Sequence, residues 1–263
     1  MGVREFRARK KEGRPLVVVA AYDALFARLS DEAGVDAVLV GDSLGNVVAG
    51  FDSTVPVTLE HMIYHGAAAR RGVTRAMLIV DMPFLTCQVG IERSLLNCGR
   101  VMQETGAHAV KIEGGDEDSV RTIKAVVRAG IPVMGHIGFT PQSVNTLGGF
   151  RVQGKGPEGA QRLVEEARRL EDAGAYSVVL ELVPSEAAQA VTDAISIPTI
   201  GIGAGAGCDG QVLVLFDLLG LTDRFSPKFL KRYANMAEDV RAAVRGFRDD
   251  VVGGRYPDSD HSF

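Results

Sequence analysis

Eight short apolar runs divide this 263-residue chain into alternating strand-like and helix-like segments. Mostly uncharged strands separated by helices are typical of a parallel sheet that is covered on its outside. Eight such units predict an α/β fold closed as a TIM (β/α)8 barrel. The runs are Leu16–Ala21, Ala37–Val40, Ala76–Val80, Ala109–Gly115, Pro132–Gly135, Ser177–Leu180, Pro198–Ile202 and Val212–Phe216.

A repeated helix-to-strand turn supports this division. Ala33-Gly34, Gly106-Ala107 and Ala173-Gly174 each stand just before an apolar run, although Ala-Gly is also a common helix end. We find no linker rich in proline or serine, so we predict one barrel domain over 1–263, with an N-terminal leader and a C-terminal helix and tail. The pattern also predicts a long loop over 138–156 and a long final helix over 227–251.

The amino-acid composition argues against nucleic acid and membranes as partners. The formal net charge of −4 gives no general attraction for nucleic acid or an anionic membrane, and no apolar run reaches the ~18 residues of a membrane span. A small-molecule substrate is therefore expected. Cys87, Cys98 and Cys208 lack metal-ligand spacing, and their odd number argues against a disulfide framework. A reducing cytoplasm is therefore expected. The basic leader over 4–14 is interpreted as a solvated helix face.

Polar side chains stand at the carboxyl ends of five consecutive predicted strands. Active sites of TIM barrels lie at that face, so the placement indicates chemistry. Lys111 and Glu113 share one face of their strand, because strand side chains alternate. Taken alone, Asp42 could equally be a turn former or helix cap. The residues at these strand ends are Asp42, Asp81, Lys111, Glu113, His136 and Glu181.

Three of these residues offer carboxylate oxygens. Asp42, Asp81 and Glu113 have no accompanying cysteine or histidine pair, and such hard ligands suit Mg²⁺. Clustered carboxylates repel one another unless a cation offsets their charge, so we predict a divalent metal site. Lys111 either adds positive charge beside it or only forms a salt bridge with Glu113.

A candidate base stands two strands farther round the barrel. Glu181 follows Val178-Val179-Leu180, and a carboxylate there could remove a proton next to a polarised carbonyl. The alternative is a structural glutamate that accepts from a backbone amide. His136 could be a base, an acid or an anchor. The glycine-rich stretch 201–207 could cradle an anion, but close packing explains it equally well.

Several motifs occur together in one order, and on them the chain resembles the ketopantoate hydroxymethyltransferase family over nearly its whole length. Motifs of this length and number rarely coincide by chance. They are Gly41-Asp42-Ser43-Leu44-Gly45, Asp52-Ser53-Thr54, Pro56-Val57-Thr58, Lys111-Ile112-Glu113-Gly114-Gly115, Gly135-His136, Thr140-Pro141-Gln142-Ser143, Leu180-Glu181, Val183-Pro184 and Ile200-Gly201-Ile202-Gly203-Ala204-Gly205.

The resemblance implies a cytoplasmic, Mg²⁺-dependent barrel of the phosphoenolpyruvate/pyruvate superfamily. Such an enzyme transfers a hydroxymethyl group from 5,10-methylenetetrahydrofolate to 3-methyl-2-oxobutanoate, through a Mg²⁺-stabilised enolate. The product, 2-dehydropantoate, opens the route to pantothenate. The family typically assembles as a homodecamer, so a homo-oligomer is expected here.

By match to the family motifs, each site residue also receives a role. Asp42, Asp81 and Glu113 correspond to the metal site, and Glu181 to the proton acceptor. The 2-oxo acid would be held by Asp42, Ser43, Asp81 and Lys111, with His136 lining the same pocket.

Two positions depart from the family pattern. Leu85-Thr86-Cys87-Gln88 stands where the family usually has a tyrosine, and Phe216 replaces a common histidine. Both departures bear on contacts with the folate rather than on the reaction class. Two rival functions remain: a superfamily relative that cleaves or rearranges a C–C or C–P bond without folate, and an inactive barrel that serves as a binding module.

Overall fold

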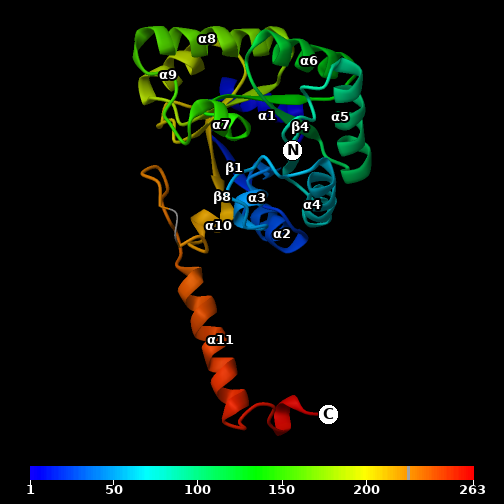
Figure 1. The fold of residues 1–263 in the computed structure, drawn as a ribbon, viewed down its shortest axis with the longest axis vertical. Coiled ribbons are helices and arrows are strands. Elements are labelled where there is room, and N and C mark those ends of the chain that lie inside the picture. The colour runs from blue at the N-terminus through cyan, green and yellow to red at the C-terminus, as the bar shows by residue number, and fades with distance from the viewer. Residues whose placement is uncertain (224–225) are drawn as a thin grey trace. The chain divides into compact units, whose positions relative to one another are not determined.

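The computed structural model describes residues 1–223 and 226–263. Contacts within the chain group it into two compact units, residues 1–214 and residues 215–263. The first unit contains all the strands (Figure 1). The second contains α10 (Leu215–Leu218), α11 (Met236–Val252) and the 3-10 turn η2 (Ser259–His261). The single domain expected over 1–263 stays a prediction.

The strands of the first unit form a closed barrel in which each strand pairs in parallel with the next along the chain and β8 pairs with β1. This confirms the predicted (β/α)8 barrel. The strands are β1 (Leu16–Ala20), β2 (Ala37–Val40), β3 (Met77–Asp81), β4 (Ala109–Glu113), β5 (Val133–Gly138), β6 (Ser177–Glu181), β7 (Thr199–Ile202) and β8 (Gly210–Val214).

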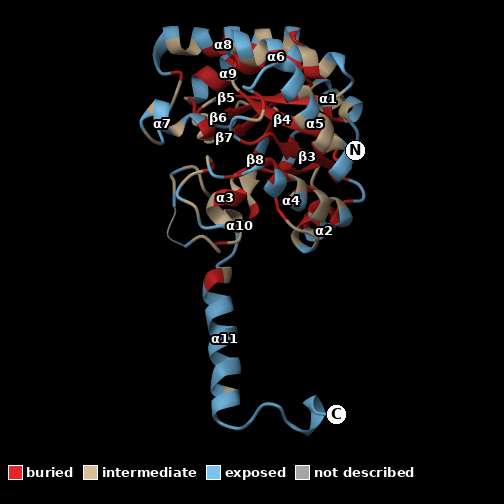
Figure 2. Cartoon of the chain, turned by 45° about the vertical axis from the view of Figure 1, so that its right-hand side comes forward, coloured by how far each residue is buried: buried red, intermediate tan, exposed pale blue. Residues whose placement is uncertain are grey.

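Helices surround the strands, with α5, α6 and α8 clearly outside them in Figure 1. Every residue of β3 and β4 is buried, and Figure 2 shows the labelled strands mostly in the buried colour. The strands of the barrel therefore form the buried core of this unit. The helices are α1 (Val3–Lys11), α2 (Ala24–Glu32), α3 (Leu44–Val47), α4 (Leu59–Gly72), α5 (Ile91–Thr105), α6 (Glu117–Arg128), α8 (Gly156–Asp172) and α9 (Ser185–Ala194).

Helix α1 lies against the end of the barrel where the strands begin. Lys10 Nζ donates to Thr192 O at 2.7 Å and to Asp209 Oδ2 at 2.9 Å, and Asp209 directly precedes β8. Phe6 is fully buried, with its ring edge-on to Tyr176 at 5.6 Å between centroids. The basic leader is solvated at Arg4, Arg7 and Lys11, as expected, while its other side packs and pairs with the barrel.

The segment predicted as one long loop over 138–156 is more structured than expected. Strand β5 continues to Gly138, which pairs with Glu181 on β6. The 3-10 turn η1 (Pro141–Ser143) and the short helix α7 (Val144–Leu147) follow.

Along the part of the chain that the structure describes, no helix is both long and apolar enough to cross a membrane.

Two predicted boundaries near the C-terminus were wrong. Strand β8 ends at Val214 instead of Phe216, because its partner β1 ends at Ala20, opposite Val214. Helix α11 begins at Met236 instead of Pro227. The backbone N–H of Tyr233 donates to Leu218 O at 2.9 Å, so this stretch folds back on α10 instead of continuing a helix.

Asp31 on α2 holds the start of β3, the strand that ends in Asp81. Its carboxylate, 4% exposed, accepts hydrogen bonds from Ala76 N at 2.6 Å, Thr74 Oγ1 at 2.7 Å and Arg75 N at 3.1 Å. Burial alone would raise the pKa of Asp31, but these hydrogen bonds outweigh it and lower the pKa below its ordinary value. The ionised carboxylate therefore stabilises the fold.

We expect Asp31→Asn to reduce the free energy of unfolding by about 2–3 kcal/mol at pH 7, because it weakens several hydrogen bonds to a buried charge. A lowered folded-state pKa contributes stability above the unfolded pKa and loses it as pH falls through the folded pKa. Urea titrations should thus show a smaller difference at pH 3. The control Glu32→Gln removes only an exposed pair with Arg28 and should change stability by less than about 0.5 kcal/mol; equal effects of the two variants would contradict the assignment.

Candidate active site

The barrel brings the predicted polar residues to one end. Asp81, Glu113 and Glu181 are the last residues of β3, β4 and β6, and Asp42 follows β2 by two positions. In the strand register, Asp81 lies opposite Lys111 and Glu113 lies opposite His136. The β3–β4 pair and the β4–β5 pair therefore each set an acid beside a base.

Lys111 is the central cation of this cluster. Its Nζ lies 2.8 Å from Asp81 Oδ1 and 4.0 Å from Glu113 Oε1, and its side chain is 5% exposed. Burial alone would lower the pKa of Lys111, but the carboxylates of Asp81, Glu113 and Asp42 outweigh this and raise it. The ammonium therefore remains charged and offsets part of the surrounding negative charge.

Asp42 is the acid that the cluster stabilises least in its charged form. Burial, followed by the carboxylates of Asp81 and Glu113, holds the pKa of Asp42 well above its ordinary value. Its own backbone N–H donates to Asp81 Oδ2 at 3.1 Å. Burial likewise raises the pKa of Asp81, although Lys111 opposes this. Two adjacent acids therefore lack enough positive charge around them.

His136 lies between two glutamates. Its Nδ1 is 3.4 Å from Glu113 Oε1 and its Nε2 is 3.2 Å from Glu181 Oε2. Burial and Lys111 lower the pKa of His136, but the contacts with the two glutamates outweigh them and raise it to about 9. Burial of Glu113 would raise its pKa, yet the contact with His136 lowers it. The imidazolium is therefore the form that this pair of carboxylates favours.

One contact of His136, with Lys111, is compatible only with the neutral imidazole. Lys111 Nζ lies 3.0 Å from His136 Nδ1, and it can donate there only to a neutral ring whose Nδ1 is unprotonated. We favour the imidazolium because carboxylates flank both ring nitrogens. A change between the two forms needs no large side-chain movement.

Glu181 differs from the other acids in its access to solvent. Its side chain is 17% exposed, whereas those of Asp81 and Glu113 are 3% and 4% exposed. His136 Nε2 contacts Glu181 Oε2 directly, so the surroundings of Glu181 are not purely apolar. An accessible carboxylate beside an oriented imidazole is suited to exchange a proton with a bound molecule.

The backbone around Glu181 is tightly constrained. Gly138 has φ +93°, and a Cβ there would lie 2.4 Å from Glu181 O, so only glycine fits between β5 and β6. Leu182, the next residue along the chain, has φ +47°. Left-handed backbone is uncommon and costly for a leucine, and strained residues of this kind cluster at functional sites. This geometry fixes the direction in which Glu181 leaves β6.

Ser43 and Gln142 complete the surroundings of the acids. Ser43 Oγ lies 2.9 Å from the hydroxyl of Tyr22, which is buried. Gln142 Nε2 donates to Asp42 Oδ2 at 2.9 Å. Sequence reasoning gave no role to Gln142 or Tyr22. Gln142 stood in a quoted motif, but it lies in a loop, where strand alternation gives no signal.

The acid cluster fits a hard cation in charge and ligand chemistry. Among the described residues, Asp81 Oδ1 and Glu113 Oε1 are buried without a well-directed hydrogen bond, so both oxygens can accept a further ligand. Over the same residues, however, no three His, Cys, Asp or Glu side chains are arranged to hold one metal ion. A metal site built from all three of Asp42, Asp81 and Glu113 therefore stays a prediction.

The glycine-rich stretch 201–207 is explained by packing. A Cβ at Gly205 would lie 2.3 Å from Ser185 Oγ, and one at Gly207 would lie 2.5 Å from Gln189 Oε1. These glycines allow the loop to lie against α9. The anion-binding alternative gains no support from these contacts.

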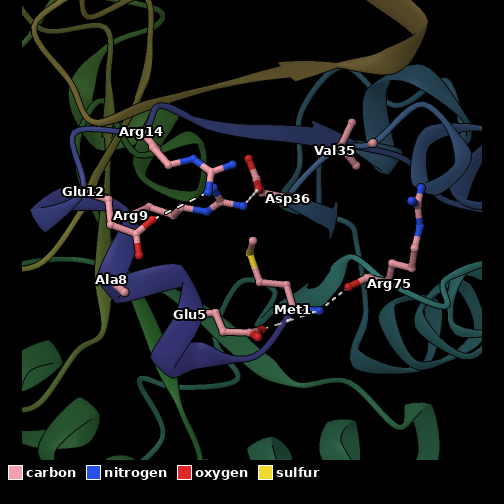
Figure 3. A pocket seen from close by; sticks show the side chains of 10 residues that line it. Met1, Glu5, Ala8, Arg9, Glu12, Arg14, Val35, Asp36 and Arg75 are labelled. Atoms are coloured by element: carbon pink, nitrogen blue, oxygen red, sulfur yellow. Dashed lines mark hydrogen bonds and ion pairs between the residues drawn. The ribbon is translucent and has the colours of Figure 1, made fainter.

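A pocket of about 480 Å³ lies at the other end of the barrel, between α1 and the residues that precede β2 and β3 (Figure 3). Its cationic groups already have partners, since Arg9 pairs with Asp36 at 3.2 Å and Arg14 with Glu12 at 3.8 Å. This pocket contains none of the predicted catalytic or substrate-binding residues.

The loop after β3, where this chain departs from the family pattern, places the thiol of Cys87 next to a second buried thiol on α5. Cys87 Sγ lies 3.8 Å from Cys98 Sγ on α5, and both cysteines are free. The Cys98 thiol and burial raise the pKa of Cys87 well above its ordinary value, so both side chains act as packing residues. The other departure, Phe216, lies in α10 instead of a strand.

Solved structures share this fold at low sequence identity. One is 2,3-dimethylmalate lyase, a PEP mutase/isocitrate lyase superfamily member, with a TM-score of 0.63, 18% identity, and coverage of 99% of this chain and 91% of that one. Another is phosphonopyruvate hydrolase in complex with oxalate and Mg²⁺, with a TM-score of 0.62, 14% identity, and coverage of 100% and 92%. These similarities establish the barrel type.

Sequence comparison defines the family more narrowly. The chain is 53% identical over 257 residues to 3-methyl-2-oxobutanoate hydroxymethyltransferase of Syntrophus aciditrophicus, covering 98% of this chain and 94% of the relative. It is 51% identical over 259 residues to the enzyme of the same name from Moorella thermoacetica, covering 98% and 96%. Residues 1–259 match the family described as Ketopantoate hydroxymethyltransferase, and the chain therefore belongs to the ketopantoate hydroxymethyltransferase family.

Proposed function

We propose that this enzyme transfers a hydroxymethyl group from 5,10-methylenetetrahydrofolate to 3-methyl-2-oxobutanoate and forms 2-dehydropantoate. The observation that best supports this reaction is the pairing of an accessible Glu181 with His136, beside a buried cluster of acids and Lys111. Such a site can remove a proton next to a carbonyl and offset the negative charge that develops.

Glu181 is the proposed proton acceptor. It takes the proton from C3 of the 2-oxo acid, and the carbanion-like carbon then forms the new C–C bond with the one-carbon unit of the folate. Water supplies the oxygen of the hydroxymethyl group as the two bonds from this carbon to the folate nitrogens break. The proton from C3 and one proton of the water end on those nitrogens, which releases tetrahydrofolate. His136, 3.2 Å from Glu181 Oε2, holds the carboxylate in one orientation and so keeps it directed at the substrate.

Lys111, Asp42, Asp81 and Ser43 are proposed to hold the 2-oxo acid. A divalent cation such as Mg²⁺, bound at Asp42, Asp81 and Glu113, would act there as a Lewis acid on the keto oxygen. Lys111 adds a fixed positive charge next to Asp81. The chain thus supplies the base and the charged lining from different strands.

Cell location, pathway and assembly follow from the same resemblance. We propose a cytoplasmic enzyme of pantothenate biosynthesis that works as a homo-oligomer, and a decamer is the assembly that family resemblance suggests. Sedimentation of the purified protein tests the assembly.

Replacement of the base should stop proton removal. We expect Glu181→Gln to slow the exchange of the C3 hydrogen of 3-methyl-2-oxobutanoate with solvent deuterium by about 100-fold or more, as for loss of a general base. The control Glu186→Gln changes an exposed glutamate in the first turn of α9 and should leave exchange unchanged. Exchange at the wild-type rate in Glu181→Gln would exclude Glu181 as the base.

Product analysis separates the proposed transfer from its rivals. With both substrates and Mg²⁺ we expect 2-dehydropantoate, and omission of the folate or chelation of the metal should each abolish it. A product formed without folate would indicate cleavage or rearrangement of the 2-oxo acid. Absence of turnover in the complete mixture would support the inactive barrel.

Loss of Lys111 should make the fold depend on a cation. We expect Lys111→Met to reduce the free energy of unfolding by about 3–5 kcal/mol at pH 8, because buried carboxylates lose their partner. Added Mg²⁺ should raise its melting temperature more than that of the wild type, since a bound ligand stabilises the native state. The control Lys124→Met, on the exposed side of α6, should show neither effect. An unchanged response to Mg²⁺ would argue against a cation at this cluster.

A further inference from the structure

Gln142 connects the carboxyl ends of three strands from the loop that follows a fourth. Its side-chain nitrogen donates to Asp42 Oδ2, after β2, and to the carbonyl oxygen of Met82, after β3, both at 2.9 Å. Its backbone N–H donates to Glu113 Oε2, at the end of β4, at 3.1 Å. Gln142 therefore contacts two of the three predicted metal-binding acids, Asp42 and Glu113, and also Met82, the residue that follows the third acid, Asp81.

The chemistry of these contacts is specific to a primary amide. The NH₂ group supplies two donors from one nitrogen without adding charge, and both are used here. A glutamate could not donate, and an apolar side chain would leave two acceptors unpaired. Asp42 is 3% exposed and Met82 is 2% exposed, so water is poorly placed to replace the lost hydrogen bonds.

The turn that carries Gln142 is well defined. Pro141 begins η1, and its ring fixes the local φ angle. Ser143 N donates to Thr140 O at 2.9 Å and closes the turn on the other side of Gln142. The backbone donor and the side-chain donors of Gln142 therefore leave the loop in set directions.

We propose that Gln142 is a positioning residue that restrains the carboxylates of Asp42 and Glu113 and thereby strengthens the binding of a divalent cation at the acid cluster. This inference rests on the proposed function, since it assigns that cation to the acid cluster. Gln142 does not need to touch the cation or the 2-oxo acid. It acts by limiting the rotation of one carboxylate with its side chain and of the other with its backbone.

A purely structural role would give a different result. Gln142 would then contribute to stability, while cation affinity in the folded variant would match the wild type. Direct measurement of cation binding distinguishes the two roles, because it does not depend on catalytic turnover. Mn²⁺ is a suitable probe, since it shares the preference of Mg²⁺ for carboxylate and water oxygens.

The test is a titration of the full-length protein with Mn²⁺, followed by the electron paramagnetic resonance signal of the free ion. We expect Gln142→Met to weaken Mn²⁺ binding by about 10–100-fold, as for loss of a residue that orients a metal ligand. The control Gln153→Met lies in the same segment and loses only a hydrogen bond from its side chain to Arg151 O, so it should bind Mn²⁺ as the wild type does. Circular dichroism melting of each variant confirms that it is folded.

A second variant keeps the test decisive if Gln142→Met folds poorly. Gln142→Asn retains the amide but is one methylene shorter, so it cannot span both acceptors and should also weaken Mn²⁺ binding. Wild-type affinity in either folded variant would overturn the role of Gln142 while leaving the proposed function intact. A wild-type protein that binds no Mn²⁺ would instead remove the cation from the proposed function, and this inference with it.

Discussion

The site depends on one buried ammonium group that is shared among acids. Lys111 lies 2.8 Å from Asp81 Oδ1 and 4.0 Å from Glu113 Oε1, and a buried charge of either sign is costly without its partner. The contact exists only because β3 and β4 pair in a register that sets Asp81 opposite Lys111. A shift of one residue would turn the strand's side chains to the other face, so barrel register and charge balance depend on each other.

Much of the fold could be predicted, because the evidence for it is periodic. Short apolar runs located all eight strands of the barrel. Boundaries that depend on a partner could not be predicted in this way. Strand β8 begins at Gly210, where a Cβ would lie 2.5 Å from Leu16 O on the neighbouring strand, and hydropathy cannot reveal that approach.

The site residues likewise fall into those that the strand pattern predicts and those that it does not. Asp81, Glu113 and Glu181 end strands, so their meeting at one face follows from the topology of the barrel. The contacts of His136 with two glutamates could not be predicted, because they depend on the choice of side-chain rotamers. Gln142 was missed for a further reason: it lies in a turn, and only its three hydrogen bonds distinguish it from an ordinary loop residue.

Helix α1 has a consequence for biosynthesis. Lys10 leaves the ribosome 199 residues ahead of its partner Asp209 and 182 residues ahead of Thr192. Until β8 emerges, β1 has neither its second neighbour nor the acid that anchors the helix before it. The contacts of α1 with Thr192 and Asp209 therefore form only after those residues have been made, and until β8 is made one edge of β1 lacks its strand neighbour.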